Sequence, residues 1–392
     1  MNTSFDTKLD RSGGISWLKD IFTPDQVRQA GLLSFAGAEF EFSTCPALIK
    51  AVQEAAGRGA FGYSIAGDAY RNAVVWWMEQ VRHWAIDPAW IVPTHGTIFA
   101  LATTIRLVTQ PGESIIILTP GYNRYEQAAT RLGRGTVRVP LTVEDGRYAI
   151  DFPALENAMA QLENKVLVLC HPCNPTGHAC TKAELEHIAA LSARYGVTVF
   201  SDEIFADVAF GEAIVPYASV AGKDAQAITC TSLGKAFSLT GVNHANVIIE
   251  NDELRERYIT QRNADHYGSV DPMIHAALLG AYTPEGLAWL EDMKAYVQEN
   301  LRVFTAYMKK RLPGVRITEP EGTFVVWVDY AGAGLSAADV EETIAGAGCL
   351  AGDEGPDYYG SDTCVRYSLA VPRGELIKAL DHLDKALSVK GL

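Results

Sequence analysis

Short apolar runs alternate with amphipathic stretches through the middle of the chain. Each run is bounded by Pro, Gly or polar residues, which is typical of strands buried on both faces of a parallel sheet. The stretches 97–109 and 181–195 have the periodicity of helices. This alternation predicts a mostly parallel sheet covered by helices, with ligands bound at the carboxyl ends of its strands. We expect strands at 114–118, 165–170, 197–201, 227–230 and 245–250.

The pattern changes after about residue 285. A long amphipathic stretch comes first, followed by runs with alternating faces at 323–329 and 364–369 and by a closing helix from residue 374. These features indicate a smaller α+β domain, and the length of 392 residues suits two domains. We expect a large domain over 45–285 and a small domain made of 1–44 and 286–392, with the N-terminal segment packed on the C-terminal part.

Composition and charge narrow the possible partners. Hydrophobic residues make up 48% of the chain and charged residues 20%, so a folded core is expected rather than disorder. The net charge of −14 should repel polyanions, so we expect no nucleic-acid partner. The first 17 residues lack the apolar run of a signal peptide, and no apolar run reaches the roughly 20 residues of a membrane span. We expect a soluble cytoplasmic protein without a membrane partner.

The cysteines raise the question of a metal site. Seven cysteines are scattered along the chain without the spacing of a disulfide framework, so reduced thiols are expected. Zinc ligands are offered by Cys170, His171, Cys173, His178 and Cys180. Structural zinc sites usually have two well-separated ligand pairs, and this cluster lacks them. We therefore expect no metal.

Three polar residues follow predicted strands at their carboxyl ends. Asn174 lies in a turn rich in Pro and Gly, Asp202 ends the next strand, and Lys235 stands in a loop of small residues after the strand at 227–230. Each also has an ordinary interpretation, as a turn former, a helix N-cap and a surface lysine. Because strand ends converge on one edge of a parallel sheet, one ligand could contact all three residues.

The motifs around these residues form a specific combination. They are NPTG at 174–177, SDEI at 201–204 and a Ser-x-x-Lys-x₅-Gly element from Ser232 to Gly241. In this order and spacing they resemble the signature of fold type I pyridoxal-phosphate enzymes of the class I/II aminotransferase superfamily, from about residue 30 to the C-terminus. The resemblance implies pyridoxal 5'-phosphate as cofactor and an aspartate aminotransferase-like α/β fold, with a mostly parallel seven-stranded sheet and a smaller α+β domain.

The resemblance also implies roles for individual residues. Lys235 would hold the cofactor covalently and move the substrate's Cα proton, Asp202 would pair with the ring nitrogen, and Asn174 would bind the ring's 3-oxygen. Other cofactor contacts would come from Gly96, Thr97 and Ser232 at the phosphate, from Tyr122 stacked on the ring, and from Phe205 beside the 3-oxygen. The substrate would be bound by Arg366, which grips the α-carboxylate, together with Gly37 and Asn174.

The N-terminal region is similar to the cystathionine β-lyase branch of MalY/PatB type. The segment 37–42, GAEFEF, resembles that branch's VADMDF, with Glu39 and Glu41 in place of two aspartates. The FGY at 61–63 resembles a motif whose tyrosine, here Tyr63, reaches the phosphate in the neighbouring subunit. This likeness implies a homodimer with shared active sites.

Three substitutions bear on the reaction type. Asn243 stands where most aminotransferases have a phosphate-binding arginine, and the lyase branch also tends to lack that arginine. Phe205 departs from both groups, since aminotransferases have tyrosine there and the lyase branch histidine; phenylalanine donates no hydrogen bond to the 3-oxygen. Gly234 replaces the usual serine before the lysine.

The expected activity is therefore that of a carbon–sulfur β-lyase, which converts cysteine S-conjugates into thiol, pyruvate and ammonia. An aminotransferase is the first alternative. Decarboxylation or oxidative deamination in specialised metabolism is the second, and Phe205 keeps it open. A regulatory binding protein is a third, because the resembled branch includes a member that represses a transcription factor by contact.

Overall fold

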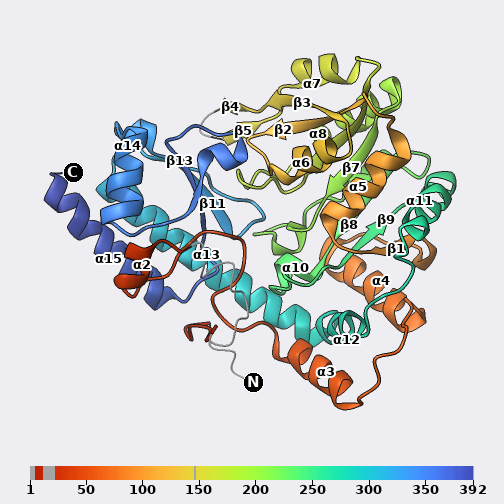
Figure 1. Ribbon diagram of the computed structural model, residues 1–392, viewed down its shortest axis with the longest axis horizontal. Coiled ribbons are helices and arrows are strands. Elements are labelled where there is room, and N and C mark those ends of the chain that lie inside the picture. Colours follow the sequence, from red (N-terminus) through yellow and green to blue (C-terminus); the bar gives the residue numbers. More distant parts are fainter. Residues whose placement is uncertain (1–4, 12–22, 145–146, 392) are drawn as a thin grey trace.

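A computed structural model describes residues 5–11, 23–144 and 147–391, and a seven-stranded sheet forms the centre of its larger part (Figure 1). The strand order is β1-β9-β8-β7-β6-β2-β3. The five strands from β8 to β3 are parallel to one another, whereas β9 is antiparallel to both β8 and β1. The expected mostly parallel sheet is confirmed. The strands are β1 (Ile91–Thr94), β2 (Ser114–Thr119), β3 (Gly135–Pro140), β6 (Asn164–Cys170), β7 (Thr198–Asp202), β8 (Ala227–Thr231) and β9 (Ala245–Ile248).

Two sets of helices cover the two faces of this sheet. Apolar side chains of α5, α6 and α11 pack on one face, and those of α7, α8 and α9 pack on the other. A two-stranded hairpin of β4 (Thr142–Glu144) and β5 (Arg147–Ala149) extends from its β3 edge. The covering helices are α5 (Thr97–Val108), α6 (Arg124–Arg131), α7 (Phe152–Met159), α8 (Lys182–Tyr195), α9 (Tyr217–Ala221) and α11 (Asp252–Ala264).

A second, antiparallel sheet lies beside the first, in the order β10-β11-β13-β12. It packs with helices α13 and α15 around a separate apolar core. Its strands are β10 (Arg316–Ile317), β11 (Val325–Asp329), β12 (Asp353–Glu354) and β13 (Cys364–Ser368). The surrounding helical elements are η3 (Tyr330–Ala333), α14 (Ala337–Asp339), the π-helical η4 (Val340–Ala347), η5 (Gly355–Tyr358) and α15 (Arg373–Lys390).

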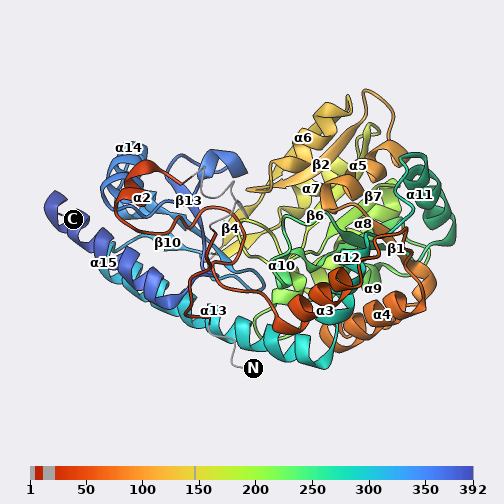
Figure 2. The same ribbon diagram turned by 60° about the horizontal axis from the view of Figure 1, so that its bottom comes forward.

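One long helix, α13 (Pro284–Arg311), joins the two parts and runs beneath both (Figures 1 and 2). Its Trp289 and Met293 are buried in the core beside the large sheet, and its Phe304 and Met308 in the core of the small sheet. The expected boundary at residue 285 therefore falls inside the first turn of a continuous helix. The exact domain limits stay a prediction. Among the described residues, no helix is long and apolar enough to cross a membrane.

The described part of the N-terminal segment contacts the small sheet. Phe35 accepts a hydrogen bond from the backbone of Ser368 and donates one to Ala351, both at 2.8 Å. Val27 of α2 (Asp25–Gln29) is packed against Ala351 in a small buried cluster. Residues 1–4 and 12–22 lie outside the described residues. They include most of the first 17 residues, in which we expected no signal peptide.

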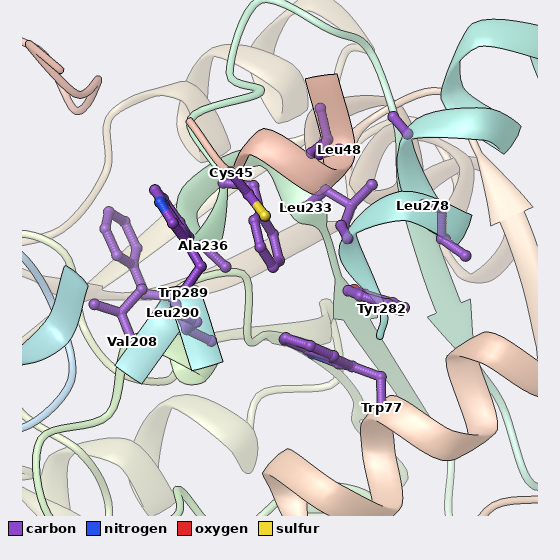
Figure 3. Close-up of a cluster of buried hydrophobic side chains, with 14 of the residues drawn as sticks. Cys45, Leu48, Trp77, Val208, Leu233, Ala236, Leu278, Tyr282, Trp289 and Leu290 are labelled. Carbon is purple, nitrogen blue, oxygen red and sulfur yellow. The ribbon is translucent and has the colours of Figure 1, made fainter. Parts of the chain in front are cut away.

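A large apolar cluster supports the short helix α10 (Leu233–Ala236), which carries Lys235 (Figure 3). Leu233 and Ala236 are both buried in it, next to Trp77, whose ring stacks on that of Tyr282 at 4.4 Å. Residues on both sides of Lys235 are thus anchored, which limits where the lysine can point. Helix α13 also contributes to this cluster, as do α3 (Pro46–Gly57), α4 (Asp68–Arg82) and α12 (Pro272–Ala281). The short η1 (Pro88–Trp90) precedes β1, and η2 (Ala206–Val208) follows β7.

Candidate active site

A cavity of about 780 Å³ lies at the carboxyl ends of β6, β7 and β8 and extends to β13 of the small sheet. Strand ends bring together side chains that are far apart in the sequence, as expected for a parallel sheet. All but one of the residues for which we predicted a cofactor or substrate contact line this cavity. They are Gly37, Gly96, Thr97, Tyr122, Asn174, Asp202, Phe205, Ser232, Lys235 and Arg366.

Lys235 extends from α10 into the cavity. Its Nζ donates a hydrogen bond to the carbonyl oxygen of Ala38 at 3.2 Å and lies 5.4 Å from the ring centre of Phe205. Burial, reinforced by the positive charge of Arg366, lowers the pKa of the lysine to about 8. A substantial fraction of the amine is therefore neutral, and nucleophilic, near neutral pH.

Asp202 is almost completely buried, with 2% of its surface exposed. Its carboxylate accepts a hydrogen bond from the Tyr125 hydroxyl at 2.5 Å and one from the Ile204 amide at 3.3 Å. Burial raises the pKa of this carboxyl group to about 6 despite these bonds. An ionised Asp202 is therefore a costly buried anion that a cationic ligand atom would stabilise.

The part of the cavity that is lined by Gly96 and Thr97 can bind an anion. Helix α5 begins there after Gly96, whose φ of +85° favours glycine, and no side chain caps its first turn. Unpaired amides at a helix N-terminus attract negative charge. The Ser232 hydroxyl lines the same cavity and donates to the carbonyl of His244 at 2.8 Å. The cavity is also lined by Asn243, the residue expected to stand in place of a phosphate-binding arginine.

Arg366 lies on β13 and is buried, with 3% of its surface exposed. Its Nη1 donates to Asn174 Oδ1 at 2.8 Å, which links the small sheet to the turn after β6. Its Nε and Nη2 donate to Asp353 Oδ2 at 3.1 and 2.6 Å, and its guanidinium lies 4.6 Å from the ring centre of Tyr358. Gly37 reaches the same carboxylate through its backbone amide, at 2.9 Å.

Two aromatic side chains shape the cavity between these groups. Phe205 is buried and packs against Phe324, with ring centres 5.3 Å apart, so it presents an apolar surface next to Lys235. Tyr122 contacts Tyr125 edge to face at 5.5 Å. Burial raises the pKa of the Tyr122 hydroxyl, which keeps that group protonated at neutral pH.

Tyr63 is the predicted site residue that does not line the cavity. It is fully exposed, as are large parts of Phe61 (64%) and Ile65 (71%). Within one chain, Tyr63 therefore does not reach the part of the cavity that is lined by Gly96 and Thr97. Its predicted role requires a second copy.

The cysteine and histidine cluster forms structural contacts. The His171 ring bonds to the Val215 carbonyl at 3.0 Å and accepts from the Cys180 amide at 3.1 Å. His178 lies 3.6 Å from carboxylate oxygens of both Glu184 and Glu321. In the part of the chain that the structure describes, no group of three or more His, Cys, Asp or Glu side chains is arranged as a metal site.

Sequence reasoning missed several residues of the site. Tyr125 binds Asp202, Ala38 binds Lys235 through its carbonyl oxygen, and Asp353 binds Arg366. Tyr125 stands close to the predicted Tyr122, but the sequence shows no sign that it faces a carboxylate. The contact of Ala38 is a backbone one, which leaves no signal in residue type. Asp353 pairs with Arg366 across two antiparallel strands, and the short β12 has no recognisable strand pattern.

Comparisons with known proteins agree with this architecture. The family model of class I and II aminotransferases matches residues 31–383. Cystathionine beta-lyase PatB of Bacillus subtilis is 27% identical over 98% of this chain and 100% of its own length, and protein MalY of Escherichia coli is 29% identical over 98% of both chains. The crystal structure of cystalysin from Treponema denticola, which contains a pyridoxal 5'-phosphate cofactor, superposes with a TM-score of 0.90 at 27% identity and covers both chains completely.

The family match covers both sheets and every residue that lines the cavity among those predicted. The fold, the strand-end positions of Asn174, Asp202 and Lys235, and the matched range lead to the same assignment. The chain belongs to the class I and II aminotransferase family.

Proposed function

We propose that this protein is a pyridoxal-phosphate carbon–sulfur β-lyase that cleaves S-substituted cysteines into a thiol, pyruvate and ammonia. The observation that carries the proposal is the single cavity that unites Lys235, Asp202, Asn174 and Arg366. It is supported by the relative named cystathionine beta-lyase PatB, whose match covers 98% of the chain. The amino acid is the expected partner; we propose no nucleic-acid or membrane partner.

The cavity fits the cofactor at three points. Lys235 has the depressed pKa that an amine needs to react with an aldehyde near neutral pH. Asp202 is a buried carboxylate that a protonated ring nitrogen would stabilise. The uncapped first turn of α5 and the Ser232 hydroxyl can hold a phosphate. When bound, pyridoxal phosphate stabilises the negative charge that develops at the substrate's Cα.

The chain's own residues then divide the work of the reaction. Arg366 binds the α-carboxylate and so orients the amino acid, with Asn174 holding the guanidinium. Once the substrate's amine has displaced it from the cofactor, Lys235 would take the proton from Cα, because its amine is the basic group that projects into the cavity. Asp202 would supply the negative charge that pairs with a protonated ring nitrogen. The Cβ–S bond breaks with its electron pair on sulfur, which takes up a proton and leaves as the thiol. Water then hydrolyses the remaining three-carbon amine to pyruvate and ammonia.

The phenyl ring of Phe205 cannot donate a hydrogen bond to the cofactor's 3-oxygen. Loss of one neutral hydrogen bond changes energies by about 0.5–1.5 kcal/mol, which alters a rate or product ratio up to about tenfold without abolishing catalysis. We therefore expect Phe205→His to change the rate of thiol release but not the products.

Product analysis tests the proposal. Holoenzyme incubated with a panel of S-substituted cysteines, without any 2-oxo acid, should release thiol, pyruvate and ammonia in equal amounts. Lys235→Ala should release none. If turnover requires a 2-oxo acid and no thiol appears, the protein is an aminotransferase. If carbon dioxide and an aldehyde appear, the decarboxylating alternative holds. No turnover together with a stable protein complex would favour a regulatory binding protein.

We also propose a homodimer in which Tyr63 of one copy completes the site of the other. The exposed apolar side chains around Tyr63 and the resemblance of FGY at 61–63 to the lyase branch support this arrangement. A cytoplasmic location is likewise a proposal, made from the sequence.

A further inference from the structure

Asp353 is the acidic residue most directly engaged with the predicted carboxylate-binding arginine. It stands opposite Arg366 in the register of β12 and β13. One oxygen, Oδ2, accepts from Arg366 Nε at 3.1 Å and Nη2 at 2.6 Å, and also from the Gly37 amide at 2.9 Å. Asp353 lines the cavity with 22% of its side chain exposed. This arrangement holds the guanidinium by one edge.

The contacts leave a defined set of donors on Arg366. A guanidinium has five N–H groups in a fixed plane. Asp353 takes one from Nε and one from Nη2, and Asn174 takes one from Nη1. Of the bonds that the described residues make, this leaves one N–H on each terminal nitrogen. A carboxylate bound in two-toothed fashion requires one donor for each of its oxygens.

The plane of the guanidinium is also held. Its carbon lies 4.6 Å from the ring centre of Tyr358, and Arg366 is 3% exposed. Rotation about the last bonds of the arginine would break both hydrogen bonds to Asp353 and leave two buried donors without an acceptor, which is unfavourable. The orientation of the two remaining N–H groups therefore depends on Asp353.

We infer that Asp353 is a positioning residue that sets the specificity for the α-carboxylate, because it occupies one edge of Arg366 and presents the two remaining terminal N–H groups to the substrate. The inference rests on the proposed function only in taking an amino acid as the substrate. Asp353 itself touches no reacting atom.

The same oxygen also contacts the backbone next to the hydrogen-bond partner of the lysine. Gly37, which donates to Asp353, precedes Ala38, whose carbonyl oxygen accepts from Lys235 Nζ. Gly37 has a φ of +78°, a conformation that glycine adopts readily, so the backbone can turn between these two contacts. Lys235 itself is anchored through α10, whose Leu233 and Ala236 are buried, so loss of the Gly37 contact should leave its amine in place.

The test compares two ligands that differ only in the carboxylate, S-benzyl-L-cysteine and S-benzylcysteamine. Binding to the holoenzyme is followed by the change in visible absorbance of the cofactor, and thiol release gives KM and kcat. Charged hydrogen bonds contribute about 1.5–3 kcal/mol each, so Asp353→Ala should raise KM and Kd for S-benzyl-L-cysteine at least about tenfold. Its kcat should stay within about threefold, and the Kd for S-benzylcysteamine should be unchanged, because neither depends on the carboxylate contact.

The conservative variant separates position from charge. Asp353→Asn retains an oxygen that can accept from Arg366, so it should restore KM to within about threefold of wild type. Glu354→Ala is the matched control, since Glu354 is the exposed neighbour on β12 and does not line the cavity. If Asp353→Ala does not fold, Asp353→Ser, whose hydroxyl is too short to reach the guanidinium edge, replaces it.

Three outcomes would overturn the inference. The first is an unchanged Kd for S-benzyl-L-cysteine in Asp353→Ala. The second is a loss of affinity in Asp353→Asn as large as that in Asp353→Ala. The third is a loss of affinity for S-benzylcysteamine in Asp353→Ala as large as that for S-benzyl-L-cysteine. Failure of the proposed function looks different, because wild-type holoenzyme would then bind S-benzyl-L-cysteine without releasing thiol. The binding comparison would still decide the role of Asp353.

Discussion

At the scale of single residues, burial sets the protonation of the two groups at the centre of the cavity. Desolvation raises the pKa of Asp202 to about 6 and lowers that of Lys235 to about 8. Both shifts disfavour the charged form, so the protein holds these groups at a cost in stability. Such a cost is characteristic of sites that are built to bind a ligand of complementary charge.

The cost of Asp202 can be measured. Its pKa in the folded chain lies above the ordinary value of 3.8, so the folded state binds the extra proton and stability falls as the pH rises from about 4 to 6. Because one pKa unit corresponds to about 1.4 kcal/mol, Asp202→Asn should raise the free energy of unfolding of the cofactor-free protein by about 1–3 kcal/mol at pH 7.5. Urea unfolding at pH 7.5 and pH 5 checks this, and the gain should be smaller at pH 5. A destabilised variant at pH 7.5 would contradict it.

The low pKa of Lys235 predicts how the cofactor is captured. Only the neutral amine attacks an aldehyde, and its fraction rises about tenfold per pH unit below a pKa near 8 and then levels off. The rate at which cofactor-free protein gains the visible absorbance of bound pyridoxal phosphate should follow this curve between pH 6 and 9. Lys235→Arg serves as the control, because it should bind without a covalent link. A rate that still rises steeply above pH 9 would show an ordinary, solvated lysine.

At the scale of elements, much of the fold was predictable because buried parallel strands leave a continuous apolar signal. All five expected strands are present, within a few residues of their predicted limits. In the seven-stranded sheet, the missed strands are β1, which contains Pro93 and lies at one edge, and β3, which lies at the other edge and carries the exposed Arg138. Edge strands mix polar with apolar residues and lack that signal.

The candidate site was predictable to the same degree and for the same reason. Asn174, Asp202 and Lys235 lie at carboxyl ends of strands or just after them, where parallel topology forces convergence. The contacts made by Asp353 and Tyr125 depend on how the small sheet and α6 pack against that edge. No local pattern in the sequence specifies such packing, so these residues emerged only from the structure.

The turn that carries Asn174 gives a prediction at this scale. Gly177 closes the turn with a φ of +74°, and an added Cβ would lie 2.5 Å from the Cβ of Pro320 in the loop before β11. Gly177→Ala therefore combines backbone strain with a clash and should cost about 2–4 kcal/mol. Gly196 has a similar φ of +67° and open space around it, so Gly196→Ala should cost only about 1 kcal/mol.

Chemical unfolding of both variants measures the difference. Gly177→Ala should also weaken cofactor binding, because a shift of the turn moves Asn174, whereas Gly196→Ala should leave it unchanged. Equal unfolding costs for the two substitutions would mean that the Pro320 loop yields without resistance.

At the scale of the whole molecule, the cavity depends on how two sheets are held together. The continuous helix α13 contributes to both cores, and the hydrogen bond from Arg366 to Asn174 crosses between the sheets. The described N-terminal segment adds a second connection, through Phe35 and Gly37 to the small sheet. Substrate binding at Arg366 can therefore act on the relative position of both sheets.

The prediction at this scale concerns the assembly of two chains. Phe61, Tyr63 and Ile65 expose apolar surface within five residues, and large exposed apolar side chains in one loop are typical of an interface. We expect a homodimer by sedimentation or light scattering, and we expect Tyr63→Phe to weaken cofactor binding, because the lost hydroxyl would donate to the neighbouring phosphate. An active monomer, or an unchanged cofactor affinity, would contradict the shared site.

Mixing two inactive variants gives the sharpest test of that sharing. In a mixed dimer of Lys235→Ala and Tyr63→Ala subunits, one of the two sites combines an intact Lys235 with an intact Tyr63 from the other copy. Random exchange makes half of the dimers mixed, so about a quarter of wild-type activity should return when the variants are denatured and refolded together. Each variant refolded alone is the control. If the mixture gains nothing while exchange is verified by a tag on one subunit, Tyr63 acts within its own chain, and the apolar loop around it must be assigned another role.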